Sequence, residues 1–259
     1  MRGTLPPAAL PQGEGSEAGR GRNVGCDRPG STARRALATR HALASSISAS
    51  ERGQVVRSAR KETPTVAVAT SGAALSTMRE ELRELIARLA VRHGTFTLTS
   101  GNVSDFYVDC RVVSTLPRAM QCIGGLMLAA LADLPDVRGV GGLAIGADPI
   151  AAAVAMASAG TERPIPMFMV RKEPKAHGTR RRIEGAFPEQ PGAPVVVVDD
   201  VITKGGSVLQ AIEAVETETQ ARVVRVVVIV DRLEGGAELL RARGYDVRAL
   251  FTRAEFPSS

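Results

Sequence analysis

The 259-residue sequence has no tryptophan, and aromatic residues make up only 3% of it. Such a composition argues against a surface that stacks nucleic-acid bases. Cysteine and histidine are also scarce, with three of each and neither a CxxC pair nor a metal-ligand spacing among them. We therefore expect reduced thiols in a cytoplasmic protein rather than a disulfide framework.

Long hydrophobic runs are absent as well. The nearest candidate, Gly141 to Gly160, is interrupted by Asp148 and Pro149 and is better explained as a strand, a loop and a helix. The net charge of +6 is confined to residues 1–77, which hold eleven Lys or Arg and five Asp or Glu, so residues 78–259 are neutral. A neutral domain without an apolar span predicts neither a membrane nor a nucleic-acid partner.

Residues 1–77 are rich in Gly, Ala, Ser, Pro and Arg and show no sustained period of 2 or 3.6. Such a segment buries too little apolar surface to offset its ordering entropy, so we predict a disordered basic extension. Its origin is open: a transit peptide, a basic tail that contacts nucleic acid or a membrane, or an extension without a fold that reflects an upstream start codon. The last is favoured, because helical periodicity begins at Met78.

From Met78 the chain alternates between helical and strand-like patterns. Apolar residues recur at helical spacing over residues 82–89, with a capping box predicted at Thr77 and Glu80 and a helix stop at Gly94. Residues 95–113 suggest a hairpin. The expected elements then follow as helix 117–132, strand, loop and helix 138–159, strand 166–170, polar loop 171–186, strand 195–199, helix 206–217, strand 223–230, and a last helix and strand at 236–251. This alternation predicts an α/β domain with a central parallel sheet flanked by helices.

The run VVVVDDVITKGGS at residues 195–207 is the most informative motif. Four valines indicate a strand buried on both faces, and Asp199 and Asp200 follow at its carboxyl end, outside the apolar core. Residues 203–207 then form a short turn whose backbone N–H groups suit a phosphate. The carboxylates suit hydroxyl groups, or a cation held near them, so the two halves together predict a sugar phosphate as the ligand. The alternative, an ordinary turn with solvated aspartates, would need neither the acidic pair nor the TKGGS sequence of the turn.

Three further segments place charged or small residues beside predicted strands. In residues 145–149 (IGADP), Gly146 allows a ligand to approach the backbone closely, and Asp148 and Pro149 predict a capped helix start. Residues 171–182 hold six Lys or Arg and one His around Gly178, which favours a mobile lid over a solvated surface. Arg232 follows the valine-rich strand, where its guanidinium can pair bidentately with a carboxylate.

These motifs resemble, in order and spacing, those of the orotate phosphoribosyltransferases, a branch of the type I phosphoribosyltransferases. VVVVDDVITKGGS resembles their signature for 5-phosphoribosyl-1-diphosphate (PRPP), and RKEPKAHG at residues 171–178 resembles their catalytic loop. Residues 99–109 (TSGNVSDFYVD) resemble their N-terminal hood, although Thr99 and Asn102 stand where lysine is common. The resemblance covers residues 78–259, with the hood at about 78–115. It implies a type I phosphoribosyltransferase-like fold.

The resemblance also implies an activity: transfer of ribose 5-phosphate from PRPP to orotate, giving orotidine 5′-monophosphate and pyrophosphate in pyrimidine synthesis. It implies Mg²⁺, held mainly by substrate oxygens and water, and a homodimer in which the lid of one subunit serves the other. The implied catalytic residues are Lys175, Asp199 and Asp200. Orotate would contact Thr203 and Arg232, and the pyrophosphate loop would be Gly146, Ala147 and Asp148. PRPP would contact Arg171, Lys172, Lys175, His177, Asp199, Asp200, Val201, Ile202, Thr203, Lys204, Gly205, Gly206 and Ser207.

Two other functions stay open. Another base could replace orotate as the acceptor, although the loop pattern and Arg232 argue against it. Alternatively, the chain could be a regulator that senses PRPP while binding nucleic acid. Such a regulator needs an element that reads nucleic acid, and the sequence offers neither a helix-turn-helix pattern nor a basic core.

Overall fold

The computed structural model describes residues 71–97, 103–134, 136–174 and 181–257, all within one compact unit of the chain. Residues 1–70 of the predicted extension lie outside the described residues. The first described helix, α3 (Gly72–Leu85), begins six residues before Met78 and is capped by Ser71, whose Oγ accepts a hydrogen bond from the Ala74 N–H (3.3 Å). The predicted capping box is therefore wrong, because Thr77 lies inside the helix and donates its hydroxyl to the Ala73 carbonyl (3.1 Å).

A hairpin follows this helix. α3 ends in a π-helical turn, η1 (Ile86–Ala90), and strand β1 (Val91–Thr97) pairs antiparallel with β2 (Val103–Val108), which confirms the predicted hairpin. Gly94 is not a helix stop: it lies within β1, where the register shifts, and adopts a φ of +151° that favours glycine. The short helix α4 (Arg111–Ser114) comes next. Together, α3, η1, β1, β2 and α4 make the hood.

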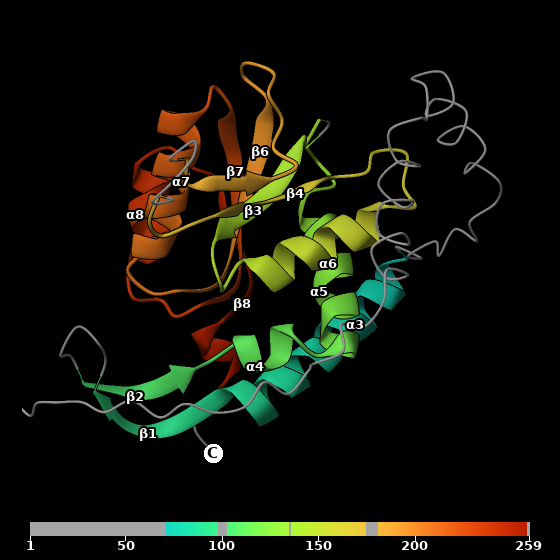
Figure 1. The fold of residues 1–259 in the computed structure, drawn as a ribbon. Helices are drawn as coiled ribbons and strands as arrows, with labels where there is room; N and C mark the ends of the chain where they lie inside the picture. Colours follow the sequence, from blue (N-terminus) through green and yellow to red (C-terminus); the bar gives the residue numbers. More distant parts are fainter. Residues whose placement is uncertain (1–70, 98–102, 135, 175–180, 258–259) are drawn as a thin grey trace, which may run out of the picture. The chain divides into compact units, whose positions relative to one another are not determined.

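The main sheet has six strands in the order β5-β4-β3-β6-β7-β8 (Figure 1). Five strands are parallel: β3 (Gly139–Leu143), β4 (Met167–Val170), β6 (Pro194–Ile202), β7 (Arg222–Asp231) and β8 (Val247–Thr252). The predicted parallel sheet is thus confirmed. One edge differs, because β5 (Ile183–Gly185) runs antiparallel to β4 inside the segment predicted as a loop. Three residues are too few to show a strand period in the sequence.

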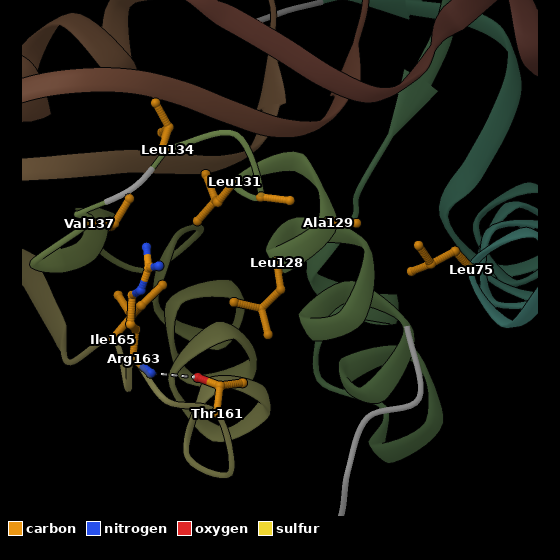
Figure 2. A pocket seen from close by; sticks show the side chains of 10 residues that line it. Leu75, Leu128, Ala129, Leu131, Leu134, Val137, Thr161, Arg163 and Ile165 are labelled. Carbon is orange, nitrogen blue, oxygen red and sulfur yellow. Dashed lines mark hydrogen bonds between the residues drawn. The ribbon is translucent and has the colours of Figure 1, made fainter. Parts of the chain in front are cut away.

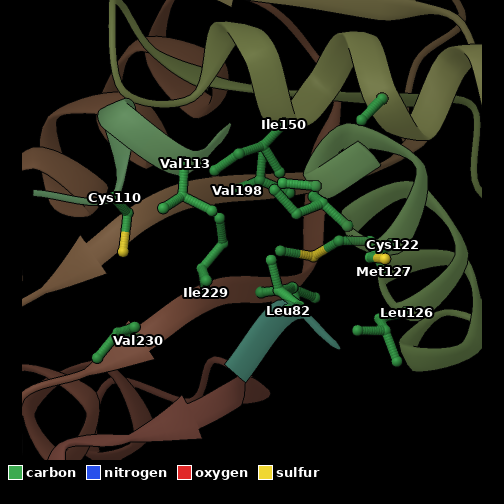
Figure 3. Packing of buried hydrophobic residues seen from close by; sticks show 14 of the residues in the cluster. Leu82, Cys110, Val113, Cys122, Leu126, Met127, Ile150, Val198, Ile229 and Val230 are labelled. Carbon is green, nitrogen blue, oxygen red and sulfur yellow. The ribbon is translucent and has the colours of Figure 1, made fainter. Parts of the chain in front are cut away.

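Helices cover both faces of this sheet, and the valines of β6 divide between the two faces. Val196 and Val198 pack with side chains of α3, α5 (Pro117–Ala130) and α6 (Asp148–Ser158), as Figure 3 shows for Val198 beside Ile150. Val195 and Val197 pack with side chains of α7 (Gly206–Glu218) and α8 (Gly236–Ala242). Burying each such side chain contributes about 1.5–3 kcal/mol. Helices on both faces explain the uninterrupted valine run.

The remaining described element is a single 3₁₀ turn, η2 (Arg253–Glu255), after β8. None of the helices in the described parts of the chain is both long and apolar enough to cross a membrane.

Candidate active site

A cavity of about 440 Å³ opens where the central parallel strands end. Its wall combines residues from the ends of β2, β3, β6 and β7 with residues that follow β4. This is the edge at which open α/β sheets bind ligands. Among the lining residues are eight of those predicted from the sequence: Gly146, Lys172, Asp199, Asp200, Val201, Thr203, Ser207 and Arg232.

The acidic pair lies within β6, which continues to Ile202, and not beyond the strand end as predicted. Asp199 is only 5% exposed, so the expectation that both carboxylates lie outside the core is wrong for this residue. Its burial follows from its place between strands β3 and β7. Two backbone N–H groups orient the pair: that of Asp200 donates to Asp199 Oδ1 (3.0 Å), and that of Val201 donates to Asp200 Oδ1 (2.8 Å).

Burial sets the electrostatics of this pair. It raises the pKa of both carboxyl groups, and repulsion from Asp200 raises the pKa of Asp199 further. Two cations act in the opposite direction, since Lys172 lowers the pKa of Asp199 and Arg111 lowers that of Asp200. Each aspartate therefore has a cation beside it, and both carboxylates gain from a ligand that donates hydrogen bonds.

The predicted phosphate turn follows directly. Gly205 has the left-handed φ of +79° that favours glycine, and α7 begins at the next residue. Thr203 and Ser207 line the cavity. Gly236 packs against the turn, with its N–H donating to the Thr203 carbonyl (2.9 Å). Backbone N–H groups at such a helix start suit a phosphate.

Not every predicted residue of this motif reaches the cavity. The Ile202 side chain is buried in the core against α7 and α8, so only its backbone can serve the site. Lys204, Gly205 and Gly206 are also not among the lining residues.

The loop after β3 brings its backbone against the acidic pair. A Cβ at Gly146 would lie 2.9 Å from Asp200 Oδ1 and 3.1 Å from Asp199 Oδ1, so a side chain at this position would force the carboxylates of the acidic pair to shift. Helix α6 begins at Asp148, one residue earlier than predicted, because Ala147 already has helical dihedral angles and acts as the N-cap. The Ala147 side chain is fully buried, and burial raises the pKa of Asp148.

Arg232 joins the hood to the main sheet. Its side chain is 5% exposed, so it is not a surface residue. The Nη2 group donates to the Phe106 carbonyl of β2 (2.9 Å) and pairs with Glu234 (2.7 Å). The turn that carries it is strained, since Leu233 has a φ of +58° and its N–H donates to Asp231 Oδ1 (2.8 Å). The guanidinium is therefore held in a fixed place at the cavity wall.

The basic loop is described only in part. Lys172 lines the cavity, whereas Arg171 pairs with Glu184 of β5 (3.7 Å) and is not among the lining residues. Lys175 and His177, two of the predicted loop residues, lie outside the described residues. The lid therefore stays a prediction.

Two charged residues of the cavity were missed in the sequence. Asp109 and Arg111 follow β2, and the guanidinium of Arg111 contacts both carboxylate oxygens of Asp109 (2.8 and 2.9 Å). An acidic and a basic residue two positions apart, just after an aromatic strand, was the available signal. This spacing was not a decisive signal, because only the tertiary structure shows that Asp109 and Arg111 line the same cavity as the acidic pair of β6.

A second cavity, of about 540 Å³, is lined by Val137 and Ile165, which lie just before β3 and β4, and by residues at the end of α5 (Figure 2). Leu131, Leu134 and Ile165 line it together with other apolar side chains, and Arg163 is its one ionisable lining residue. The described lining residues of this cavity include no carboxylate, histidine, lysine or cysteine, so we place the chemistry at the smaller cavity.

The oxygen donors of the smaller cavity fit Mg²⁺ only if the substrate supplies most of the ligands. Asp199 and Asp200 offer the hard carboxylate oxygens that this ion prefers. Within the described ranges, however, no group of three or more His, Cys, Asp or Glu is placed to hold a metal ion.

Comparison with known proteins places the site in a family context. The phosphoribosyl transferase domain family matches residues 140–249. An orotate phosphoribosyltransferase of Sorangium cellulosum is 43% identical over 184 residues, which cover 71% of this chain and 95% of that protein. One from Mycobacterium bovis is 45% identical over 177 residues, which cover 68% of this chain and 95% of that protein.

Solved structures agree with these relatives. The orotate phosphoribosyltransferase of Mycobacterium tuberculosis in complex with Fe(III) dicitrate has a TM-score of 0.61 and 44% identity, covering 70% of this chain and 99% of that one. Its complex with 5-phospho-alpha-D-ribosyl 1-diphosphate (PRPP) has a TM-score of 0.55 and 37% identity, covering 70% of this chain and 92% of that one.

Proposed function

This chain belongs to the orotate phosphoribosyltransferase family, and from that premise we propose that it joins N1 of orotate to C1 of the ribose of PRPP. The C1–O bond to the diphosphate breaks, and the products are orotidine 5′-monophosphate and pyrophosphate. One observation carries the proposal: the acidic pair of β6, the phosphate turn and Arg232 line a single cavity. These three features match the hydroxyl groups, the 5′-phosphate and the carboxylate that the two substrates present.

The acidic pair of β6 and the turn that follows it match the ribose phosphate half of PRPP. Asp199 and Asp200 accept hydrogen bonds from the 2′- and 3′-hydroxyls, and their negative charge favours the cationic ribose that forms as the C1–O bond breaks. The backbone N–H groups of residues 203–207 and the hydroxyl of Ser207 bind the 5′-phosphate. The sugar is thereby held at both ends while C1 reacts.

The carboxylate of orotate is the proposed ligand of the Arg232 guanidinium. A carboxylate entering the cavity meets a guanidinium that Phe106 and Glu234 already orient. Such charge-assisted pairs are roughly twice as strong as neutral hydrogen bonds. Thr203 lines the same cavity and contributes a hydroxyl to the base. Bases without a carboxylate lack this contact, so the arginine favours orotate.

The departing diphosphate requires positive charge. Lys172 and Gly146 both line the cavity. We propose that Arg171, Lys175 and His177 join Lys172 when the loop closes, each loop serving the neighbouring subunit of a homodimer. Bound Mg²⁺, held mainly by substrate oxygens and water beside the acidic pair, would neutralise part of the diphosphate charge. Exclusion of water on closure strengthens all of these interactions.

A base panel tests the proposed reaction. The full chain is incubated with PRPP and Mg²⁺, and pyrophosphate release is followed with orotate, uracil, adenine or hypoxanthine as the acceptor. Of the four bases, we expect only orotate to cause pyrophosphate release, and we expect that release to stop when EDTA removes the metal ion. Release with a purine and none with orotate would show a phosphoribosyltransferase of another branch. PRPP binding without release for any base would favour the regulator.

A further inference from the structure

Arg111 and Asp109 line the catalytic cavity, although neither residue was assigned a role in the site from the sequence: Asp109 ends the hood motif and Arg111 lies just beyond it. They follow hood strand β2 and so bring a second charged pair to the acidic pair of β6. We propose that Arg111 is a substrate-binding residue that contacts the diphosphate group of PRPP, and that Asp109 is the positioning residue that holds it. This inference rests on the proposed function.

Asp109 fixes the guanidinium of Arg111 through three contacts. Its Oδ1 accepts from the Arg111 backbone N–H (3.1 Å) and from Nε (2.8 Å), and its Oδ2 accepts from Nη2 (2.9 Å). Nη1 has no hydrogen-bond partner among the residues that the structure describes. A bidentate pair fixes the plane of the guanidinium, so its remaining donors are oriented before a ligand arrives.

The backbone that carries this pair is rigid, whereas the guanidinium is accessible. The Asp109 N–H donates to the Ala90 carbonyl (3.1 Å), and the adjacent Cys110 and Val113 are buried in the core (Figure 3). The Arg111 side chain is nevertheless 57% exposed. An ion pair this exposed adds little to folding stability. Its geometry is better explained by a contact with a charged ligand.

The charges of the cavity indicate which ligand group Arg111 contacts. Arg232 is engaged by Phe106 and Glu234, and we assign it to the orotate carboxylate. Arg111 and Lys172 line the same cavity as the acidic pair, and their positive charges lower the pKa of Asp200 and of Asp199, respectively. If that pair holds the 2′- and 3′-hydroxyls, the 1-diphosphate is attached at the adjoining carbon of the ribose. A planar, preoriented guanidinium matches diphosphate oxygens well.

The variant Arg111→Gln tests this assignment, because it keeps the polar side chain and removes the charge. We expect the affinity for pyrophosphate with Mg²⁺, measured by isothermal titration calorimetry, to fall by roughly 10-fold or more, the loss typical of one charge-assisted contact. The KM for PRPP should rise similarly while the KM for orotate is unchanged. Asp109→Asn keeps Arg111 but loosens its contacts, so it should cause a smaller loss, and Arg111→Lys should restore part of the affinity.

Arg118→Gln is the matched control. Arg118 is 54% exposed and paired with Glu81, but it is not among the cavity residues, so its loss should leave pyrophosphate affinity unchanged.

Wild-type affinities for pyrophosphate and PRPP in Arg111→Gln, with circular dichroism confirming the fold, would overturn the assignment. A rise confined to the KM for orotate would also overturn it, because Arg111 would then bind the carboxylate. Failure of the wild-type chain to bind PRPP would instead contradict the proposed function. If Arg111→Gln fails to fold, the two single variants Arg111→Lys and Asp109→Asn take its place. Wild-type affinity for pyrophosphate in both of them would contradict the proposal.

Discussion

Asp199 shows at the scale of one residue how the site opposes folding stability. The carboxyl group is 5% exposed and has Asp200 beside it, so ionising it in the folded protein is unfavourable. Under the proposed function, the hydroxyl groups of the ribose would replace the water that the buried carboxylate lost. Stability and activity therefore conflict at this position.

Asp199→Asn separates the two effects. Burial and the charge of Asp200 raise the pKa of Asp199 in the folded protein to about 8, above its unfolded value. The free energy of unfolding of the wild type therefore falls as the pH rises from the unfolded pKa of an aspartate toward about 8, where the buried carboxyl group ionises. At about pH 8 the variant should melt higher than the wild type, by roughly 2–4 °C for each kcal/mol regained. At about pH 5 the difference should shrink. Melting followed by circular dichroism at both pH values is the measurement.

Turnover should fall strongly in the same variant. A melting temperature below that of the wild type at both pH values would show that Asp199 supports the fold, and would contradict its assignment to the ligand.

Single residues also show how far the sequence predicts the site. The acidic pair, Gly146 and Arg232 could be predicted, because each lies within or just after a recognisable strand. The burial of Asp199 could not, because it depends on the strands on either side of β6. Arg111 was missed for a similar reason: its place in the cavity depends on how α4 packs against η1 and α5.

At the scale of elements, the phosphate turn depends on the packing of a neighbouring helix. Gly236 opens α8, and a Cβ there would lie 2.4 Å from the Thr203 carbonyl oxygen and 2.6 Å from the Gly205 nitrogen. Both are backbone atoms of the turn, so a side chain at this position must displace it. The sequence predicted the turn and the helix separately, but not this contact between them.

Gly236→Ala should therefore both destabilise the protein and weaken PRPP binding. Overpacking of this kind costs about 1–3 kcal/mol, which should lower the midpoint of urea unfolding. The displaced turn should also raise the KM for PRPP. Gly72→Ala is the control, because a Cβ at Gly72 has no neighbour within 4 Å. An unchanged midpoint and KM in Gly236→Ala would show that the turn adapts without loss.

At the scale of the whole molecule, the hood is anchored by a helix that begins earlier than the sequence indicated. Helical periodicity is weak before Met78, since Leu75 is the one large apolar residue of the first turns. Leu75 nevertheless packs against the core, and Ser71 caps the helix. The last residues of the predicted extension thus belong to the folded domain.

Two truncations locate the functional boundary. Removal of residues 1–70 should leave turnover and melting temperature unchanged. Removal of residues 1–77 takes away the Ser71 cap, which contributes about 1 kcal/mol, together with the packing of Leu75, and should lower the melting temperature. Loss of turnover after removal of residues 1–70, with the far-ultraviolet circular dichroism spectrum preserved, would show that the extension takes part in function.

Orotate-dependent release of pyrophosphate from PRPP, compared between the wild type and the double variant Asp199→Asn with Asp200→Asn, tests the central claim most directly. The wild type should release pyrophosphate only when orotate and Mg²⁺ are both present. The double variant should remain folded and lose at least about 100-fold in rate, the loss typical when charge stabilisation of a transition state is removed. Release at the wild-type rate by the folded double variant would contradict the claim that this cavity is the active site.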